Sequence, residues 1–412
     1  MADHLFDGRR WRDGRTGVVL DGNRIVDVMP AAALPHEGPR IIELPSTWTL
    51  LPGLIDMHVH LGDWSAPDDV ARSRERLMLH AAENARKLLA AGVTTVRDVG
   101  APNGVAIAVR DAVNGGQLQA SRVFAAGRVI CMTGGHGSEG ADGAAAQQVT
   151  GVDACRRAVR EELRAGADLI KFVMDGARRV PGKAVLEFTQ EEASAIVDEA
   201  HRLGVAAAAH TFQPETTAIA LHAGADTIEH GLHLSPENIQ TMVGNGTWLV
   251  PTIKVTHHVI AHGEREMRDS NDFGAQALAR ARQAAATQEA SFRAALDAGV
   301  RIAAGTDTSS VAGGIDSLPG ELDHMRSLGM SIDAVIRSAT SSAAEALERG
   351  GDLGVLAPGA LADLLAVDGV PSGDLSCLSR PRLVVTNGRF FVPGTSTPSP
   401  ASIPALLTME TL

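Results

Sequence analysis

The sequence predicts an α/β protein in which a TIM-like (β/α)8 barrel is joined to a small β-sandwich domain formed from both chain termini. Three observations support this prediction. Short apolar runs alternate with helix-patterned stretches from about residue 50 onward. Eight such strand and helix units span about 250 residues, which is the usual size of one barrel. The two chain ends share a different pattern, in which short strand-like runs are broken by Gly and Asp.

The two chain ends support the small domain. Residues 1–49 hold short apolar runs separated by turn residues. Residues 351–412 return to this pattern and end in a tail rich in Pro and Ser. Residues 50–350, between them, carry the barrel pattern. We therefore expect the two end segments to pair in one β-domain that the barrel interrupts.

Apolar runs define the expected barrel strands. They lie near residues 54–59, 93–98, 123–130, 168–173, 205–209, 226–229, 247–251 and 300–305. Helical patterns follow most of these runs, for example at residues 76–91, 152–165, 190–203 and 277–298. The last two helices end just before Gly204 and Gly299, and glycine readily adopts the left-handed conformation that closes a helix. Further helices are expected between Ser331 and Arg349.

Composition and charge limit the classes of partner. The 412 residues include 37 Lys and Arg against 49 Asp and Glu, a net charge of −12. This excess of acid disfavours nucleic acid and anionic membrane surfaces, because both are bound by clustered positive charge. No apolar stretch approaches the roughly 18 residues of a membrane span, and the N-terminus lacks the apolar core of a signal peptide. We expect a homo-oligomer that acts on a small molecule, with no nucleic acid or membrane partner.

The cysteines indicate the compartment. Cys131, Cys155 and Cys377 form no close pair in the sequence, so neither a disulfide framework nor a cysteine zinc site is indicated. A reducing environment fits this pattern best. We therefore expect a cytoplasmic protein.

Polar residues that end the expected strands form the candidate site, because barrel active sites lie at the carboxyl ends of the strands. The first strand ends in His58-Val59-His60, whose alternation places both imidazoles on the same side of the strand. Other strands contribute one residue each: Lys171, His210, His230 and Asp307. Imidazole and carboxylate are the usual ligands of zinc-like ions. The pattern predicts a metal site at the barrel mouth.

Each of these residues also has a simpler interpretation. A single histidine at a strand end is more often a hydrogen-bonded structural residue, and a lone buried lysine usually pairs with a carboxylate or reaches solvent. Six such groups at one predicted barrel mouth are much harder to explain in this way, so the metal site is the preferred interpretation.

Two other motifs are weaker. His257, His258 and His262 cluster in the connection of residues 253–275, which is rich in charged residues, so a solvated loop or lid is expected there in preference to a second metal centre. Residues 135–140 formally match a dinucleotide-binding pattern, but no clear helix opens directly on them. We expect instead a glycine-rich loop that places His136 over the barrel mouth.

With these residues in place, the chain resembles the amidohydrolase superfamily. The matching motifs are His58-x-His60, Lys171, His210, Glu229-His230-Gly231, Gly305-Thr306-Asp307 and the segment 359–364. Within the superfamily, the segments 133–137 and 93–98 resemble the branch of prolidase-like dipeptidases and imidazolonepropionase-related enzymes.

The resemblance implies a binuclear metal hydrolase that cleaves the C–N amide bond of a small molecule, such as a dipeptide or an N-acyl amino acid. It implies two divalent metal ions, expected to be Zn²⁺, and a carboxylated lysine, formed from carbon dioxide at Lys171, that bridges them. His58, His60 and Asp307 would hold one ion, and His210 and His230 the other. Asp307 would take the proton of a metal-bridging hydroxide and deliver it to the leaving nitrogen.

Several residues near these motifs are candidates for substrate contact. His136 is expected to contact the substrate and to assist catalysis. Arg178 could bind a substrate carboxylate, and Phe212 stands where several relatives carry a tyrosine that touches the substrate. His233 completes this group of substrate-binding candidates.

Two alternatives remain open at this point. A mononuclear enzyme of the same fold would open a cyclic amide or deaminate a base, but a one-metal site does not need the lysine that apolar residues flank in the fourth strand. A catalytically inactive scaffold would be expected to lose ligands, and this sequence lacks none of them.

Overall fold

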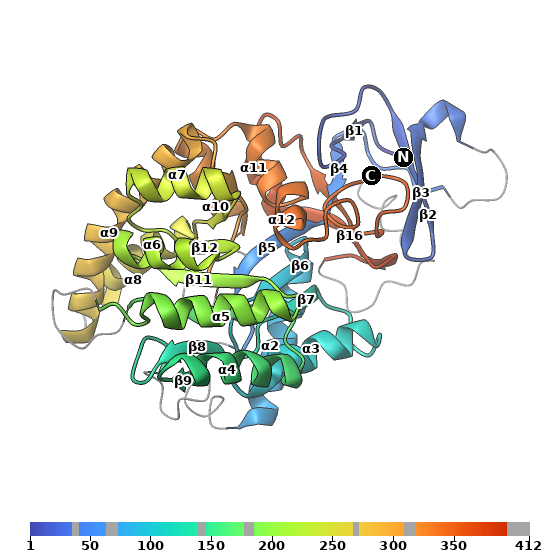
Figure 1. Ribbon diagram of the computed structural model, residues 1–412. Coiled ribbons are helices and arrows are strands. Elements are labelled where there is room, and N and C mark those ends of the chain that lie inside the picture. Colours follow the sequence, from blue (N-terminus) through green and yellow to red (C-terminus); the bar gives the residue numbers. More distant parts are fainter. Residues whose placement is uncertain are drawn as a thin grey trace.

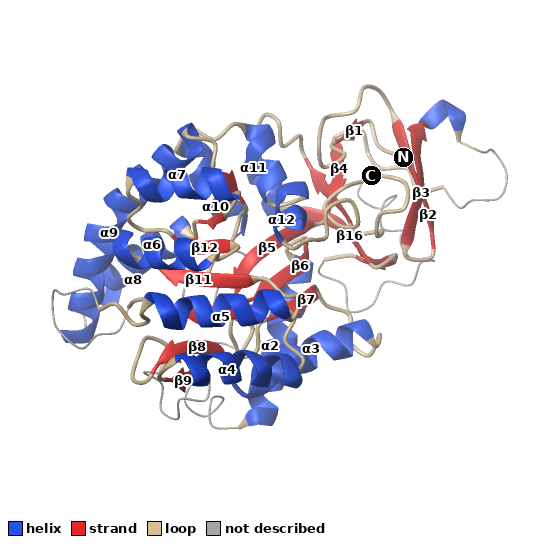
Figure 2. Ribbon diagram, in the orientation of Figure 1, coloured by secondary structure: helices blue, strands red, loops and turns tan. Residues whose placement is uncertain are grey.

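The computed structural model describes residues 1–34, 41–62, 73–138, 146–176, 185–266, 272–308 and 318–393, with backbone alone at residues 259, 262–266 and 272–281. Within these ranges, eight parallel strands follow one another around a barrel (Figure 2). They are β5 (Leu54–Val59), β6 (Val93–Asp98), β7 (Arg122–Ala125), β10 (Ile170–Val173), β11 (Ala207–Thr211), β12 (Thr227–His230), β13 (Trp248–Val250) and β14 (Arg301–Ile302). The predicted (β/α)8 barrel is therefore confirmed.

Backbone hydrogen bonds join the strands into a closed ring. Strands β5 to β7 form one sheet, and β10 to β14 belong to a second sheet. On one side, the N–H of Asp307 donates to the carbonyl of His58 at 2.8 Å, which joins the segment after β14 to β5. On the other side, the N–H of Asp168 donates to the carbonyl of Ala125 at 2.8 Å, which joins the segment just before β10 to β7. Closure brings the ends of all these strands to one rim.

Helices cover the outside of the barrel (Figure 1). They are α2 (Arg74–Ala90), α3 (Val105–Asn114), α4 (Val152–Ala165), α5 (Gln190–Arg202), α6 (Pro214–Ala223), α7 (Pro236–Asn245), α8 (Ile253–Glu266), α9 (Asp272–Asp297), α10 (Leu318–Ser327), α11 (Ile332–Ser338) and α12 (Ser341–Ala346). Short 3-10 turns occur at Ala31–Ala33, Pro102–Gly104 and Leu375–Ser379. Gly204 and Gly299 follow helix ends with φ of 80° and 82°, as predicted.

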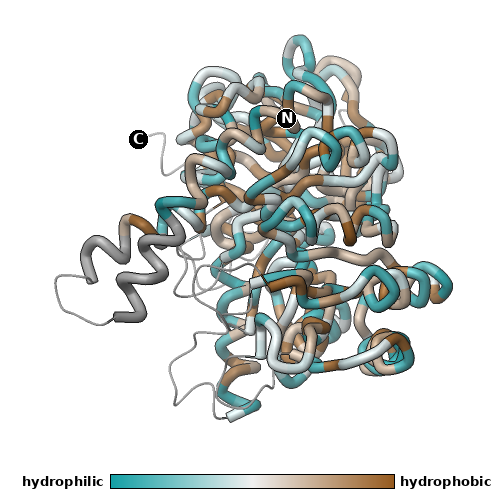
Figure 3. The backbone as a smooth tube through the Cα atoms, turned by 60° about the vertical axis from the view of Figure 1, so that its left-hand side comes forward, coloured by the Kyte–Doolittle hydropathy of each residue, from teal (hydrophilic) through white to brown (hydrophobic). Residues whose placement is uncertain are grey.

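Alternation along the strands separates the core from the site. Ile170 and Ile228 lie in one buried apolar cluster with Ile196 of α5. Lys171 and Glu229, which follow them in the strands, face the opposite way because successive strand side chains alternate. Apolar and polar stretches likewise alternate along the surrounding helices (Figure 3).

Two expectations for the barrel were wrong in detail. The expected strand at residues 123–130 is two strands, β7 and β8 (Val129–Met132), because Gly127 between them turns the chain with φ of 74°. Strand β8 pairs with an additional strand, β9 (Ala146–Val149). The connection at residues 253–275 is not a loop over its described length, because α8 and the start of α9 occupy it. The Glu321 carboxylate accepts the first N–H groups of α8, from Ile253 and Lys254, which accounts for its start.

The small domain lies beside the barrel and combines both chain ends (Figure 1). Its main sheet has the order β1-β4-β15-β16-β17, and a hairpin of β2 and β3 packs against it. The bounds are β1 (His4–Leu5), β2 (Thr16–Asp21), β3 (Arg24–Pro30), β4 (Trp48–Pro52), β15 (Leu364–Asp368), β16 (Pro381–Thr386) and β17 (Arg389–Phe391). Strand β4 pairs antiparallel with β15, so the predicted domain built from both termini is confirmed.

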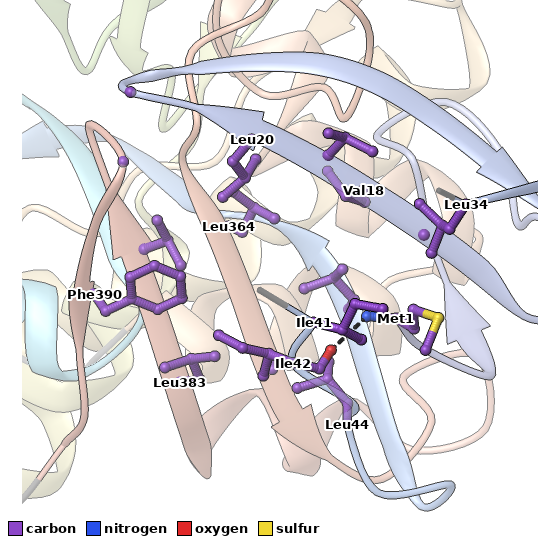
Figure 4. A pocket seen from close by; sticks show the side chains of 17 residues that line it. Met1, Val18, Leu20, Leu34, Ile41, Ile42, Leu44, Leu364, Leu383 and Phe390 are labelled. Atoms are coloured by element: carbon purple, nitrogen blue, oxygen red, sulfur yellow. Dashed lines mark hydrogen bonds between the residues drawn. The ribbon is translucent and has the colours of Figure 1, made fainter. Parts of the chain in front are cut away.

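Apolar side chains meet between the hairpin and the main sheet of the small domain. They line a cavity of about 520 Å³, to which Val18 and Leu20 contribute from β2 and Leu364, Leu383 and Phe390 from the main sheet (Figure 4). Among the described residues, no helix has both the length and the apolar character needed to cross a bilayer.

Candidate metal centre

Three of the predicted ligands meet at the seam between β5 and the segment after β14. The Asp307 Oδ1 atom lies 3.2 Å from Nε2 of His60 and 3.5 Å from Nε2 of His58. The ligand atoms of these three residues all lie within 4.8 Å of one another. Two imidazoles and a carboxylate at this spacing can hold a zinc-like ion.

His210 and His230 lie next to this group. Their ring centroids are 4.5 Å apart, and the His230 ring is 4.9 Å from that of His58. The Nε2 atom of His210 is buried and has no hydrogen-bond partner among the described residues. An unsatisfied buried nitrogen of this kind is unfavourable without a ligand, so the site fits a cation.

Lys171 lies on β10, the strand next to the one that carries His210, and is only 2% exposed. Burial lowers the pKa of its ammonium group to about 8, although the carboxylates of Glu229 and Asp307 oppose the change. A lysine of this kind is partly neutral near pH 8, and only the neutral amine reacts with carbon dioxide.

Hydrogen bonds to Nδ1 orient three of the imidazoles. The Nδ1 atom of His58 lies 2.7 Å from Glu229, that of His60 lies 2.8 Å from the Gly100 carbonyl, and that of His230 lies 2.7 Å from the Thr252 hydroxyl. Each contact leaves Nε2 available to a metal. Outer partners of this type fix the tautomer and the direction of metal-binding histidines.

The same partners form a buried charge network that the sequence interpretation missed. Glu229 is fully buried, and its carboxylate receives a hydrogen bond of 2.6 Å from Arg97. Burial alone would raise the pKa of Glu229, but Arg97 and His58 outweigh it and hold the pKa well below its usual range. The sequence does contain one sign of this network. Arg97 lies within the apolar strand at residues 93–98, and a buried arginine requires a buried anion as its partner.

The charge state of the site suits metal binding. Burial, assisted by Lys171, lowers the pKa of His58 to about 4, and burial also holds the pKa values of His210 and His230 well below their usual range. Burial opposes ionisation of Asp307, but the neighbouring histidines outweigh it and keep the pKa of this carboxyl low. Near neutral pH the site therefore offers neutral imidazoles at His58, His210 and His230 and an ionised carboxylate at Asp307. His60 differs, because burial is outweighed by the Asp307 carboxylate, which raises the pKa of the His60 imidazole.

Unusual backbone conformations occur where the strands end. His230, Thr252 and Asp307 have φ of 68°, 49° and 54°, a region that residues other than glycine seldom adopt. Gly305 has room for no side chain, because an added Cβ would lie 2.8 Å from the Cβ of His58. Such strain is typical of functional sites, where the surrounding fold holds it in place.

The predicted substrate-binding residues are only partly brought together. The Phe212 ring centroid lies 4.3 Å from that of His210, and the His136 ring centroid lies 5.0 Å from it. His233 is exposed after β12, and its N–H donates to the Phe212 carbonyl at 3.1 Å. Arg178 lies outside the described residues. The loop that carries Phe212 is held by Asp175, whose carboxylate accepts the N–H of Phe212 at 3.0 Å.

The fold and this site define a barrel hydrolase, and the comparison with known families agrees. The family model described as Amidohydrolase family matches residues 49–391, and the chain belongs to this family. It is a hydrolase that acts on amide carbon–nitrogen bonds.

Its relatives place it within the prolidase-like and imidazolonepropionase-related part of the family. A solved Xaa-Pro dipeptidase with methionine bound in its active site is 34% identical, with a TM-score of 0.85 over 95% of this chain and 98% of that one. Ochratoxinase of Aspergillus niger is 29% identical over 367 residues, covering 81% of this chain and 73% of the fungal protein. Imidazolonepropionase of Nocardia farcinica is 33% identical over 42% of this chain and 40% of its own.

Proposed function

We propose that this protein is a binuclear metal hydrolase that cleaves the amide bond of a dipeptide, an N-acyl amino acid or a similar small molecule. The observation that carries the proposal is the buried Lys171 beside two sets of potential ligands. His58, His60 and Asp307 would hold one ion, and His210 and His230 would hold the other. A carboxylated Lys171 would join the two ions, which we propose to be Zn²⁺.

The ions would supply the electrophilic chemistry, by making water more acidic and polarising the substrate carbonyl. The chain supplies the proton transfer. Because the pKa of Asp307 is held low, its carboxylate is ionised and can accept a proton from the attacking water, then deliver it to the leaving nitrogen. Glu229 contributes by holding His58 in one orientation.

The substrate class rests on the relatives and on the rim of the site. The dipeptidase among the structural neighbours favours a dipeptide or an N-acyl amino acid, which has the same amide bond beside a carboxylate. The rings of His136 and Phe212 border the metal-binding histidines, where a substrate side chain or ring would pack. We propose that Arg178 and His233 contact the polar end of the substrate.

A mononuclear enzyme that opens a cyclic amide is the second candidate, favoured by the likeness to imidazolonepropionase over part of the chain. This alternative gives no role to Lys171. The role of Lys171 therefore distinguishes the binuclear enzyme from the mononuclear one.

The test is the metal content per chain, measured by elemental analysis after purification with zinc and bicarbonate. Lys171→Ala should hold at least one ion fewer than wild type, and short carboxylic acids should restore part of the loss. Lys87→Ala, a change of an exposed lysine on α2, serves as the matched control and should leave the metal content unchanged.

An unchanged metal content in folded Lys171→Ala would contradict the bridged centre and favour the mononuclear enzyme. Wild type should also hydrolyse members of a panel of dipeptides and N-acyl amino acids. Hydrolysis of cyclic amides alone would move the assignment to the second candidate.

A further inference from the structure

We propose that this chain has a second divalent-metal site, separate from the barrel centre, formed by His257 of α8, Glu289 of α9 and His324 of α10. The three residues come from three different helices on the outside of the barrel. Their ligand atoms all lie within 4.8 Å of one another. None of them belongs to the group at the barrel mouth.

The two separations between Glu289 and the histidines are close to those around a bound ion. The Glu289 Oε1 atom lies 3.1 Å from Nε2 of His257 and 3.6 Å from Nε2 of His324. In a tetrahedral zinc site with ligand bonds of about 2.0–2.1 Å, two ligand atoms lie about 3.3–3.4 Å apart. The two observed separations fall on either side of this value, so an ion could be bound with only small side-chain movements.

The donor set also suits a zinc-like ion. Two imidazoles and one glutamate form a known zinc ligand set, which leaves a fourth position for water. The Nε2 atom of His257 is buried and has no hydrogen-bond partner among the described residues, even though Glu289 is close. The side chains of Glu289 and His324 are 25% and 27% exposed, so an ion can enter from solvent.

The groups around the cluster favour a bound cation over direct contacts among the three side chains alone. The imidazole rings of His257 and His324 lie 4.2 Å apart, a spacing at which two protonated rings would repel each other. Arg293 approaches the other oxygen of Glu289 at 3.4 Å, which leaves Oε1 facing the histidines.

The position of the site suggests what the ion would do. Helix α8 begins directly after β13, and Glu321 of α10 accepts the first N–H groups of α8. An ion held by His257, Glu289 and His324 would fasten α8 to α9 and α10 close to this junction. We assign the ion a structural role in holding these three helices together.

The test compares zinc stoichiometry after equilibrium dialysis in wild type, Glu289→Gln and the double variant His257→Asn/His324→Asn. Each variant should bind about one ion fewer per chain than wild type, because a three-ligand site does not survive loss of its members. His222→Asn, which changes an exposed histidine on α6, is the matched control and should bind as many ions as wild type.

A second arm separates this site from the barrel centre. Adding His324→Asn to Lys171→Ala should remove about one further ion, because the two changes act on different sites. The cluster variants should also retain the hydrolytic activity and the circular dichroism spectrum of wild type. Equal stoichiometry in wild type and folded cluster variants would overturn the proposal and leave only an ion pair between His257 and Glu289.

Discussion

At the scale of the residue, a hydrogen bond to Nδ1 determines which nitrogen a histidine of the barrel centre presents to a metal. His58, His60 and His230 each use Nδ1 in a contact with a carboxylate, a carbonyl or a hydroxyl group. Their Nε2 atoms then face the site, where those of His58 and His60 lie 3.5 and 3.2 Å from Asp307. At His210, the Nε2 atom itself is buried and has no hydrogen-bond partner among the described residues, so it depends on a ligand.

Asp307→Asn tests the proton transfer. The amide keeps the shape of the side chain but cannot accept a proton, so kcat should fall by roughly 10² to 10⁴ while most of the bound metal is retained. The measurement is kcat on any substrate that wild type hydrolyses, together with metal content. The exposed Asp297→Asn on α9 is the control, and near-wild-type turnover by Asp307→Asn would remove this role.

Glu229→Gln tests the orientation of His58. Gln cannot match the charge that both His58 and Arg97 require, so zinc should bind about 10- to 100-fold more weakly. Competition with a chelator of known affinity measures the change. Glu237→Gln alters an exposed glutamate of α7 and should have no effect. Wild-type zinc affinity in a folded Glu229→Gln protein would show that the hydrogen bond to His58 is dispensable.

At the scale of the element, strand ends and helix starts position the functional groups. Strand alternation sends Ile170 to the apolar core and Lys171 to the barrel interior. Helix α8 starts where the buried carboxylate of Glu321 accepts the N–H groups of Ile253 and Lys254. The start of α8 therefore depends on the charge state of a residue in α10.

Glu321 should make stability depend on pH. Burial raises its pKa to about 7, above the 4.5 of an unfolded glutamate. The folded state therefore binds the proton more tightly, so this contribution to stability is fully present below pH 4.5 and is lost as the pH rises through 7. The difference amounts to about 3 kcal/mol at most.

Glu321→Gln should remove this dependence. Its melting temperature should fall less than that of wild type between pH 5.5 and 8.5, as measured by differential scanning calorimetry. Glu83→Gln, on the exposed face of α2, should retain the wild-type pH profile. Parallel profiles for Glu321→Gln and wild type would show that Glu321 does not titrate in this range.

At the scale of the whole molecule, barrel closure joins parts of the chain that lie far apart in the sequence. Asp307 reaches His58 through the backbone seam between the first and last strands. The small domain joins distant parts of the chain in the same way. Strand β4 precedes the barrel in the sequence, and it pairs with β15, which follows the barrel. The candidate metal centre therefore links the beginning of the barrel to its end.

Removing metal should destabilise the whole chain. Without ions, His210 Nε2 stays buried without a partner, and the ligands no longer connect their strands. A chelator should lower the melting temperature by several degrees, and added zinc should restore it. Chelator that is already saturated with zinc is the control. An unchanged melting temperature after complete loss of metal would show that the fold does not depend on the ions.

Much of this protein could be predicted from the sequence because its signals are local. Apolar runs of strand length, helix patterns between them and a polar residue at the end of each run predict the barrel and the metal-binding candidates His58, His60, Lys171, His210, His230 and Asp307. Strand alternation fixes which side chains share a face, whatever the rest of the chain does. Local turns were harder to predict, and the apolar pattern did not predict the break at Gly127 that separates β7 from β8.

Only the tertiary structure decided which distant groups meet. Glu229 and Arg97 became partners through the packing of β6 and β12 inside the barrel, and no spacing in the sequence relates them. The histidines at 257, 258 and 262 looked like one cluster, yet the partners of His257 are Glu289 and His324 from two other helices. Contacts of this kind depend on how whole elements pack in three dimensions, whereas the sequence pattern reports only the periodicity of each element alone.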